Sequence, residues 1–315
     1  MKAYLGITDS DWIETLGATG PEVAQANFWN PGGTKSFRAL QHGELFLFKT
    51  HMANGDRIVG GGVFDAFVFM RVDEAWETFG LANGVSSIQE FLARVGKYRR
   101  SAGAMTASTQ VGCTLLRDVR FFDPVEEQRR PDDFATNIVQ GRAYDLDELE
   151  AEHPVLVAAA HLTAPGMVAP GAPVPLDVQQ RMFGDARLQV VRLGQDAFKA
   201  VIAHNYGHHC AITGDKVRPV LEAAHILPVA SGGQHRPDNG LLLRSDMHTL
   251  YDRGYIAVDD RYRLRVSPQL RAEFGNGDAL YAKAGEAIAT PARRVDKPGR
   301  EFLQWHMETV FKQSA

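Results

Sequence analysis

The sequence predicts an α+β protein of two domains, and three observations support this prediction. Short runs of β-branched and aromatic residues recur through the first half of the chain, a proline-rich stretch follows them, and the second half contains a strand, a loop, a second strand and a helix in close succession. We expect the first half to form a small curved β-barrel with flanking helices. The second half is expected to form a compact strand–strand–helix core with additional helices.

Strands of the first domain are predicted where short apolar runs lie between turn residues. These runs cover residues 4–7, 44–49, 58–64, 66–69 and 112–116. The spacing of apolar residues predicts helices over 73–79 and 88–95. The triplet Gly60-Gly61-Gly62 has neither the helix nor the spacing of a phosphate-binding loop, so we interpret it as a bend in a strand where another backbone approaches closely.

Prolines mark the predicted boundary between the two domains. Between residues 161 and 176 the chain carries Pro165, Pro170, Pro173 and Pro175 among Gly and Ala residues, a composition typical of an extended, semi-stiff connector. We therefore predict a first domain at residues 1–152, a linker at 153–180 and a second domain at 181–315. The second domain is expected to contain a helix over 195–206, a strand over 262–266 and a helix over 302–311.

Composition restricts the class of protein. A chain of 315 residues is long enough to bury two separate cores. Its net charge of −4 at pH 7 argues against a protein that coats nucleic acid indiscriminately. The two cysteines, Cys113 and Cys210, exclude a structural zinc site of four thiolates and agree with a reducing compartment. The sequence contains neither an apolar run of membrane-spanning length nor a signal-peptide pattern, so we expect a soluble cytoplasmic protein with no membrane partner.

Three polar side chains in the second half follow an order that suits phosphodiester hydrolysis. His225 ends an apolar run, Asn239 lies on the returning side of a Gly-Gly loop, and His248 opens a short amphipathic stretch. Hydrolysis with one metal ion needs a neutral imidazole that takes a proton from water, a cation that stabilises the developing charge, and a group that fixes the base. We predict that His225 is the general base, that Asn239 grips backbone across the hairpin, and that His248 binds the metal.

Asp252 is predicted to be a second metal ligand. It lies four residues after His248, so the two side chains share one face of a helix and can reach the same ion. A nitrogen donor and an oxygen donor together suit a divalent cation of intermediate hardness. We expect Mg²⁺ or Mn²⁺, with Zn²⁺ as a further option.

Residues 210–258 resemble the HNH, or ββα-metal, family of nucleases. The resemblance rests on Cys210-Ala211-Ile212-Thr213-Gly214, on the run from Leu221 to Ile226, on Asn239-Gly240-Leu241-Leu242-Leu243, and on the run from His248 to Gly254. It implies a metal-dependent endonuclease whose products carry 5′-phosphates. Many members have a metal-binding Asp or His directly before the base histidine, where this chain has Ala224. Glu222 is the candidate replacement, although strand alternation with His225 is expected to place it on the opposite face.

The first half resembles the PUA superfamily, which includes the EVE, ASCH, YTH and SRA modules that hold a modified base. A loop that contains Trp29, a strand from Gly43 to Lys49, a strand from Ile58 to Gly62, and the segment from Ile138 to Gly141 carry this resemblance. The whole chain is similar to HNH restriction endonucleases. The resemblance implies a type IV-like, modification-dependent restriction enzyme that acts against foreign double-stranded DNA, and we expect the modified base to be a cytosine derivative.

Seven residues of the first domain are candidates for binding the modified base, because aromatic rings sandwich a flipped base and polar groups contact its edge. They are Phe28, Trp29, Asn30, Phe37, Phe48, Lys49 and Thr50. Trp29 is the preferred stacking residue, since Asn, Pro and two Gly residues after it suggest a loop. The alternative is that Phe46 and Phe48, which share one face of their strand, fill the interior of the barrel.

Charged residues near these sites divide into two groups. The candidates for DNA phosphate contacts are Arg244, Arg253, Lys97 and Arg99. The acidic residues between 126 and 152 are expected to form a solvated face. His235, in the loop between His225 and Asn239, is expected either to be exposed to solvent or to contact a phosphate.

Two other functions remain open at this point. The chain could be a DNA-binding module with an inactive nuclease domain, an alternative favoured by the missing ligand at Ala224. It could also be an RNA-directed HNH nuclease, since PUA-like folds also bind RNA. Because double-strand cleavage needs two nicks and one chain has one predicted active site, we expect a homodimer or transient pairing on DNA.

Overall fold

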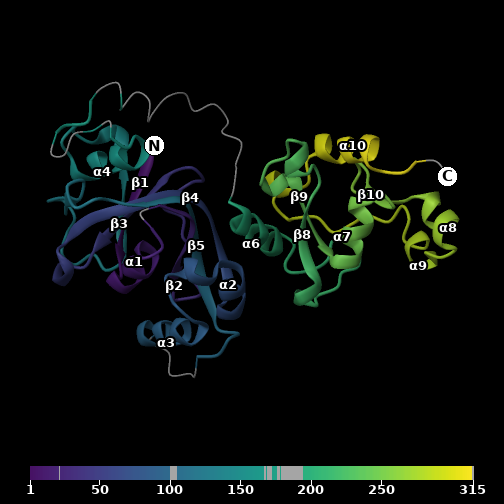
Figure 1. The fold of residues 1–315 in the computed structure, drawn as a ribbon, viewed down its shortest axis with the longest axis horizontal. Coiled ribbons are helices and arrows are strands. Elements are labelled where there is room, and N and C mark those ends of the chain that lie inside the picture. The colour runs from purple at the N-terminus through teal and green to yellow at the C-terminus, as the bar shows by residue number, and fades with distance from the viewer. Residues whose placement is uncertain are drawn as a thin grey trace. The chain divides into compact units, whose positions relative to one another are not determined.

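The computed structural model describes residues 1–20, 22–99, 105–166, 168, 172–175, 178 and 194–313. The chain divides into two compact units, Met1–Val190 and Val191–Ala315 (Figure 1). None of the described helices combines the length and the hydropathy that a membrane crossing requires.

A mixed sheet forms the centre of the first unit. Its strands are β1 (Lys2–Thr8), β2 (Glu22–Asn30), β3 (Leu45–Thr50), β4 (Arg57–Arg71), β5 (Gln110–Phe121), β6 (Gln128–Arg129) and β7 (Gly141–Asp145). The strand order is β2-β5-β4-β3-β1-β7, with β6 paired to β4, and β1 runs parallel to β3. A closed barrel requires its first and last strands to pair. Within the described residues β2 and β7 do not pair, so the predicted curved barrel is corrected to an open sheet.

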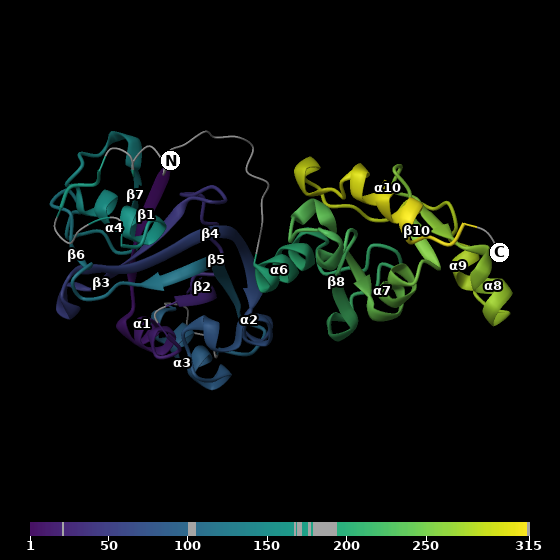
Figure 2. The ribbon, with the colours of Figure 1, turned by 45° about the horizontal axis from the view of Figure 1, so that its top comes forward.

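The long strand β4 bends within this sheet (Figure 2). The two strands expected over 58–64 and 66–69 are one strand of 15 residues, whose pairing with β5 shifts register twice. A Cβ atom on Gly61 would lie 2.7 Å from the carbonyl oxygen of Phe46, and one on Gly62 would lie 2.8 Å from Cγ2 of Val119. The predicted bend with close backbone approach is therefore confirmed, because side chains larger than hydrogen do not fit there.

The helices of the first unit are α1 (Ser10–Gly17), α2 (Val72–Phe79), α3 (Ile88–Tyr98) and α4 (Pro154–Thr163). Helices α2 and α3 confirm the predictions over 73–79 and 88–95. The sequence patterns did not predict α1, α4 or strand β2.

Helix α4 corrects the predicted linker. Every residue from 155 to 162 is buried, and the apolar members join a cluster that also contains Val168, Val174 and Val178. A helix that is apolar on all sides must be buried, and this requirement outweighs the prolines that follow it. The described part of residues 153–180 therefore belongs to the first unit, and the rest of that range lies outside the described residues.

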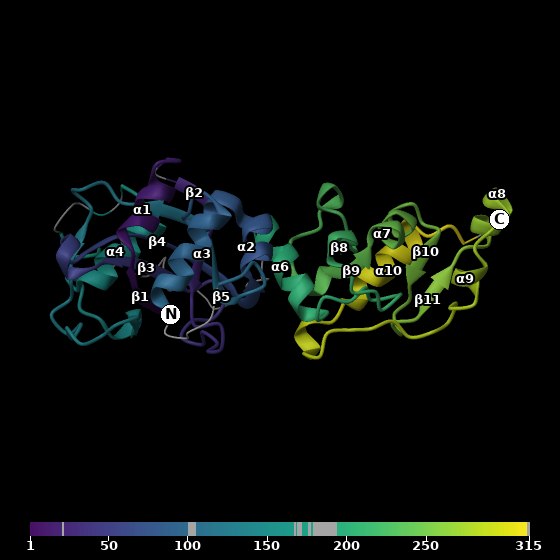
Figure 3. The same cartoon turned by 90° about the horizontal axis from the view of Figure 1, so that it is seen from below.

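The elements of the second unit are α6 (Gln195–Asn205), β8 (Leu221–His225), β9 (Gly240–Arg244), α7 (Ser245–Asp252), β10 (Ile256–Val258), β11 (Leu264–Val266), α8 (Pro268–Phe274), α9 (Asp278–Tyr281) and α10 (Arg300–Thr309). Strands β8 and β9 pair antiparallel, α7 follows β9 directly, and α6 packs against both strands (Figure 3). The predicted first helix, the strand–loop–strand–helix order and the C-terminal helix are confirmed. Strand β11 begins two residues later than predicted, after Tyr262, whose φ of 58° is left-handed.

The assignment of α4 to the first unit can be tested with Leu156→Ala. Leu156 is 1% exposed, and truncation of a buried leucine costs about 2–5 kcal/mol of the free energy of unfolding. Val139→Ala is the control, because Val139 is 84% exposed. Urea unfolding of both variants should show a large loss for Leu156→Ala and almost none for Val139→Ala. Equal, small losses of the free energy of unfolding in both variants would indicate that α4 belongs to the linker and not to the core of the first unit.

Candidate active site

The strand pair β8–β9 and the helix α7 place the three predicted residues around one loop. His225 is the last residue of β8 and pairs in register with Gly240, the first residue of β9. Ala224 and Leu241, the next pair along the ladder, are fully buried. The end of β8 is therefore a rigid position, and the loop 226–239 begins and ends there.

Asn239 is fully buried and fixes this loop. Its side-chain Oδ1 accepts a hydrogen bond from the backbone N–H of Leu227 at 2.9 Å. Its Nδ2 donates to the carbonyl oxygens of Leu227 at 2.9 Å and Gln234 at 3.0 Å. One amide side chain thus satisfies three backbone groups of the loop, which is the geometry expected for a residue that grips the backbone across the hairpin.

His225 is half-buried against an aromatic ring. Its ring stacks on Phe198 of α6, with centroids 4.2 Å apart and planes at 12°. Burial, the largest cause, together with the neighbouring His235 and His248 lowers the pKa of His225 to about 4. The imidazole is therefore neutral at neutral pH and can accept a proton. Its Nε2 lies 3.0 Å from His235 Nδ1, while Nδ1 has no partner among the described residues.

His248 lies between two carboxylates. Its Nδ1 is 2.6 Å from Oε2 of Glu222, and its Nε2 is 3.4 Å from Oδ2 of Asp252. Burial raises the pKa of Asp252, a shift that His248 opposes and Glu222 reinforces. Glu222 and His225 are three residues apart in β8, so strand alternation places their side chains on opposite faces. The carboxylate of Glu222 nevertheless contacts His248 on α7. The structure thus brings together the three side chains considered as metal ligands.

The chemistry of these three side chains suits a divalent cation, whereas their present arrangement does not converge on one point. One imidazole and two carboxylates are common ligands of Mg²⁺, Mn²⁺ and Zn²⁺. Each carboxylate, however, contacts a different nitrogen of the ring. Across the described ranges, no group of three His, Cys, Asp or Glu residues is arranged to hold a metal ion. A cation held by His248 would replace one of these two contacts.

The arginines near this site are partly compensated by carboxylates. Arg244 Nε and Nη2 each lie 2.7 Å from an oxygen of Asp246, and Nη1 lies 3.3 Å from Asp215. Arg253 is exposed at the end of α7, and its side chain has no hydrogen bond or ion pair with any described residue. Of these two candidates for phosphate contacts, Arg253 has the uncompensated charge.

The other two phosphate candidates, Lys97 and Arg99, belong to the first unit. The Nζ atom of Lys97 lies 5.1 Å from the centre of the Tyr98 ring. Arg99 Nη1 donates to the carbonyl oxygen of Gln110 at 3.3 Å. Neither residue has a carboxylate within ion-pair distance in the described part of the chain.

The aromatic candidates for base binding lie in or at the edge of one core cluster of the first unit. Phe48 is fully buried, 6.0 Å from Phe46, so the alternative that these two rings fill the interior is confirmed. Phe28 and Phe37 are partly exposed at the margin of this cluster, and their ring centroids lie 4.7 Å and 6.0 Å from that of Phe46.

The position expected for Trp29 is corrected. Trp29 lies in β2 and pairs with Cys113 of β5, so the loop begins only after Asn30. The Trp29 Nε1 atom donates to the carbonyl oxygen of Asn83 at 2.9 Å, and its ring packs 5.1 Å from that of Phe91. Trp29 is therefore held between a strand and a helix rather than presented by a loop.

The polar candidates for base binding make internal contacts. Lys49 is buried, donates to the Thr50 carbonyl oxygen at 2.9 Å and pairs with Asp56. The Thr50 hydroxyl bonds the backbone of Arg57. Asn30 Oδ1 accepts from the backbone N–H of Gly32 at 2.8 Å. In this arrangement all three stabilise local structure.

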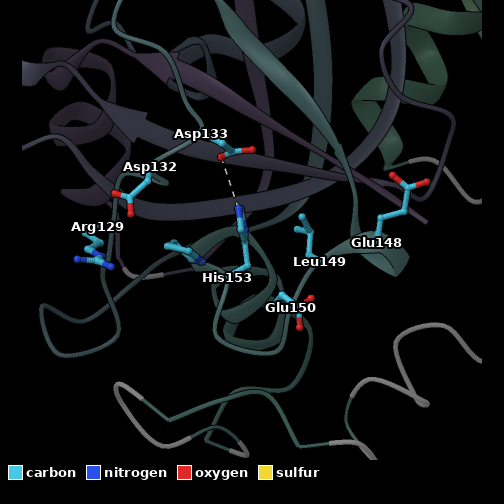
Figure 4. Close-up of a pocket in the computed structure, with 8 residues that line it drawn as sticks. Arg129, Asp132, Asp133, Glu148, Leu149, Glu150 and His153 are labelled. Atoms are coloured by element: carbon cyan, nitrogen blue, oxygen red, sulfur yellow. Dashed lines mark ion pairs between the residues drawn. The ribbon is translucent and has the colours of Figure 1, made fainter.

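A cavity of about 320 Å³ lies in the first unit, and its lining includes none of the candidates for base binding (Figure 4). Its lining comes largely from the acidic stretch and consists of Arg129, Asp132, Asp133, Glu148, Leu149, Glu150, His153 and Pro154. His153 Nε2 lies 3.5 Å from Asp133 Oδ1. Four carboxylates around one opening repel phosphate, so this cavity does not suit nucleic acid.

His235 makes a contact that the sequence did not predict. It was expected either to be exposed to solvent or to contact a phosphate, whereas its Nδ1 contacts Nε2 of His225. The only signal in the sequence is a third histidine between His225 and Asn239, and a polar loop of unknown path does not show which residue folds back. Phe198 lies in the helix predicted over 195–206, but the sequence did not single it out, and it stacks on the predicted base.

Comparison with known proteins supports the interpretation of the second unit. Residues 210–259 match the model of the HNH endonuclease family. No relative among curated proteins matches the chain. A solved structure of a modification-dependent TagI restriction endonuclease is similar with 13% identity and a TM-score of 0.29, covering 92% of this chain and 76% of that one. A mutant ZmASCH protein from Zymomonas mobilis is similar with 10% identity and a TM-score of 0.28, covering 58% of this chain and 97% of that one. TM-scores this low do not establish a shared fold, whereas the family match places an HNH endonuclease domain at residues 210–259.

Proposed function

We propose that the protein is a metal-dependent DNA endonuclease that cleaves modified DNA. The observation that carries the nuclease proposal is the state of His225 within the HNH-matched segment. The residue is neutral, held on two sides and open at Nδ1. A general base needs these three properties before its substrate arrives.

The resemblance to HNH nucleases and the positions of the side chains support the following reaction. His225 Nδ1 takes a proton from a water molecule while the water oxygen forms a bond to phosphorus. The bond from phosphorus to the 3′ oxygen breaks, the 3′ oxygen takes a proton from solvent, and the 5′-phosphate stays on the other product. A divalent cation held by His248, with Asp252 and Glu222, would stabilise the charge on the phosphate. Asn239 holds the loop that faces the substrate.

The proposed substrate is double-stranded DNA with a modified cytosine, bound through the first unit. The motifs from Gly43 to Lys49 and from Ile58 to Gly62 support this proposal through their resemblance to PUA-like readers of modified bases. Phe28 and Phe37 are the rings that can stack on a base, since both are partly exposed beside an aromatic cluster. Two copies of the chain would supply the two nicks of a double-strand break.

An inactive nuclease domain is the second candidate function, and one observation favours it. Ala224 supplies no ligand, and the two carboxylates contact opposite nitrogens of His248 rather than a common point. If the domain has lost its metal, the protein binds modified DNA without cutting it. Metal binding therefore separates the two candidates.

His225→Ala is expected to reduce plasmid nicking by about 100- to 10,000-fold, the contribution typical of a general base. DNA binding should be unchanged, since the substitution removes no positive charge at neutral pH. With the metal kept saturating, protonation of His225 should lower the wild-type rate as the pH approaches about 4, because only the neutral imidazole accepts a proton. His51→Ala, at an exposed histidine of the first unit, serves as the control. Unchanged nicking by His225→Ala would remove the base assignment.

His248→Ala tests the metal site directly. Loss of an outer-shell partner already weakens metal affinity by about 10- to 100-fold, and loss of a ligand should cost at least as much. Titration calorimetry with Mn²⁺ should show uptake by the wild type and by His225→Ala, but strongly weakened uptake by His248→Ala. A wild type that binds no Mn²⁺ would favour the inactive domain.

The substrate proposal is tested with identical duplexes that carry cytosine, 5-methylcytosine, 5-hydroxymethylcytosine or its glucosylated form, each with Mg²⁺, Mn²⁺ or EDTA. Cleavage should require metal and be confined to modified duplexes. Base stacking is worth about 1–3 kcal/mol, so Phe37→Leu should weaken binding of the preferred duplex by roughly 5- to 150-fold. Equal cleavage of all four duplexes would retain the nuclease and refute the base reader, and cleavage of a matched RNA instead would identify an RNA nuclease.

A further inference from the structure

Two histidines contact each other at the proposed catalytic centre. His225 Nε2 and His235 Nδ1 are 3.0 Å apart, and their rings meet at 58°. This distance is that of a hydrogen bond between ring nitrogens, and one of the two must donate. The direction of that bond decides which nitrogen of His225 carries a proton.

The two directions have opposite consequences for catalysis. If His225 donates from Nε2, its Nδ1 carries a lone pair and can accept a proton from water. If His225 accepts at Nε2, its single proton lies on Nδ1. That nitrogen then has no lone pair with which to accept a proton from water. The first direction places the protons of both rings on Nε2, which is the tautomer that free histidine prefers. The second would place both protons on Nδ1.

His235 is held in position to act as the acceptor. Asn239 Nδ2 donates to the carbonyl oxygen of the preceding residue, Gln234, at 3.0 Å. The backbone N–H of Arg236, the next residue, also bonds that carbonyl oxygen at 2.8 Å. Phe198 lies 4.2 Å from the His225 ring and 5.6 Å from the His235 ring, so one aromatic side chain orients both.

The surroundings favour a neutral His235. Burial lowers its pKa, and the positive charge of Lys199 on α6 lowers it further. From α7, His248 acts on His225 in the same direction. A protonated His235 would have two N–H donors and could not accept a bond from His225. The neutral form therefore keeps the pair intact near neutral pH.

We propose that His235 is a positioning residue for His225: its Nδ1 accepts the His225 Nε2–H, which leaves Nδ1 of His225 unprotonated and directed to the attacking water. This inference rests on the proposed function, because it assigns His235 a role relative to the general base. His235 itself touches neither the water nor the phosphate in this scheme. It acts on the rate through the tautomer and orientation of its partner.

The tautomer is measured first, by long-range ¹H–¹⁵N NMR on the full chain with ¹⁵N-labelled histidine at neutral pH. The His225 signals are assigned by their loss in His225→Gln. We expect Nε2 of His225 to be protonated and Nδ1 to be unprotonated in the wild type. A proton on Nδ1 would overturn the proposal, and this readout requires no catalytic activity.

Kinetics of three further variants then test the role in catalysis. His235→Leu removes the acceptor, His235→Asn keeps an acceptor oxygen close to the position of Nδ1, and Ser231→Ala changes an exposed residue of the same loop. Relative to wild type, kcat should fall by about 10- to 100-fold in His235→Leu. It should recover most of this loss in His235→Asn and stay unchanged in Ser231→Ala, with KM similar throughout.

The outcomes separate this inference from the proposed function. A kcat for His235→Leu within twofold of wild type would overturn the positioning role. Equal losses in His235→Leu and His235→Asn would indicate packing alone and would also overturn it. If the wild type cuts no substrate, the proposed function fails, and the NMR result alone then decides whether His235 accepts from His225.

Discussion

The side chain of Asn239 is the constraint on which the rest of the proposed catalytic centre depends. Its three hydrogen bonds tie the two ends of the loop that follows β8 and reach the carbonyl oxygen beside His235. Loss of the side chain would leave the N–H and the carbonyl oxygen of Leu227 without these bonds, and an unpaired buried polar group costs about 1–3 kcal/mol. The loop path and the place of His235 therefore depend on one buried amide, and His235 together with Phe198 orients His225.

The surroundings of His225 and His248, the two histidines of the HNH pattern, differ in polarity and therefore suit different chemistry. His225 lies against Phe198 and another imidazole, which keeps it neutral and basic at one nitrogen. His248 lies between the carboxylates of Glu222 and Asp252, which attract a bound cation. The same residue type thus suits the proposed proton acceptor at one position and the proposed metal ligand at the other, because one setting is apolar and the other is anionic.

The sequence predicted the order of the second unit well, since residue identity and spacing along a hairpin and a helix are local properties. It did not predict the contact between His225 and His235, which depends on the path of a 14-residue loop between β8 and β9. In the first unit, Trp29 was misplaced because turn residues after it suggested a loop, whereas pairing with β5 extends β2 through Asn30. Helix α4 was missed because prolines nearby outweighed, in the sequence, an apolar run whose burial only the sheet reveals.

The two units carry charge of opposite sign. Residues 191–315 contain 17 Lys and Arg residues against 14 Asp and Glu residues, whereas residues 1–190 contain 17 against 24, so the negative net charge of the chain belongs to the first unit. Affinity for any DNA rises with the number of phosphates that free basic groups neutralise. In the second unit some basic groups are already paired, since Arg244 is matched by Asp246 and Asp215, and Arg236 bonds Asp238 through two nitrogens. Attraction to any duplex therefore comes from the unpaired basic groups of the second unit, whereas the proposed base-stacking contacts of the first unit would be made only on a modified duplex.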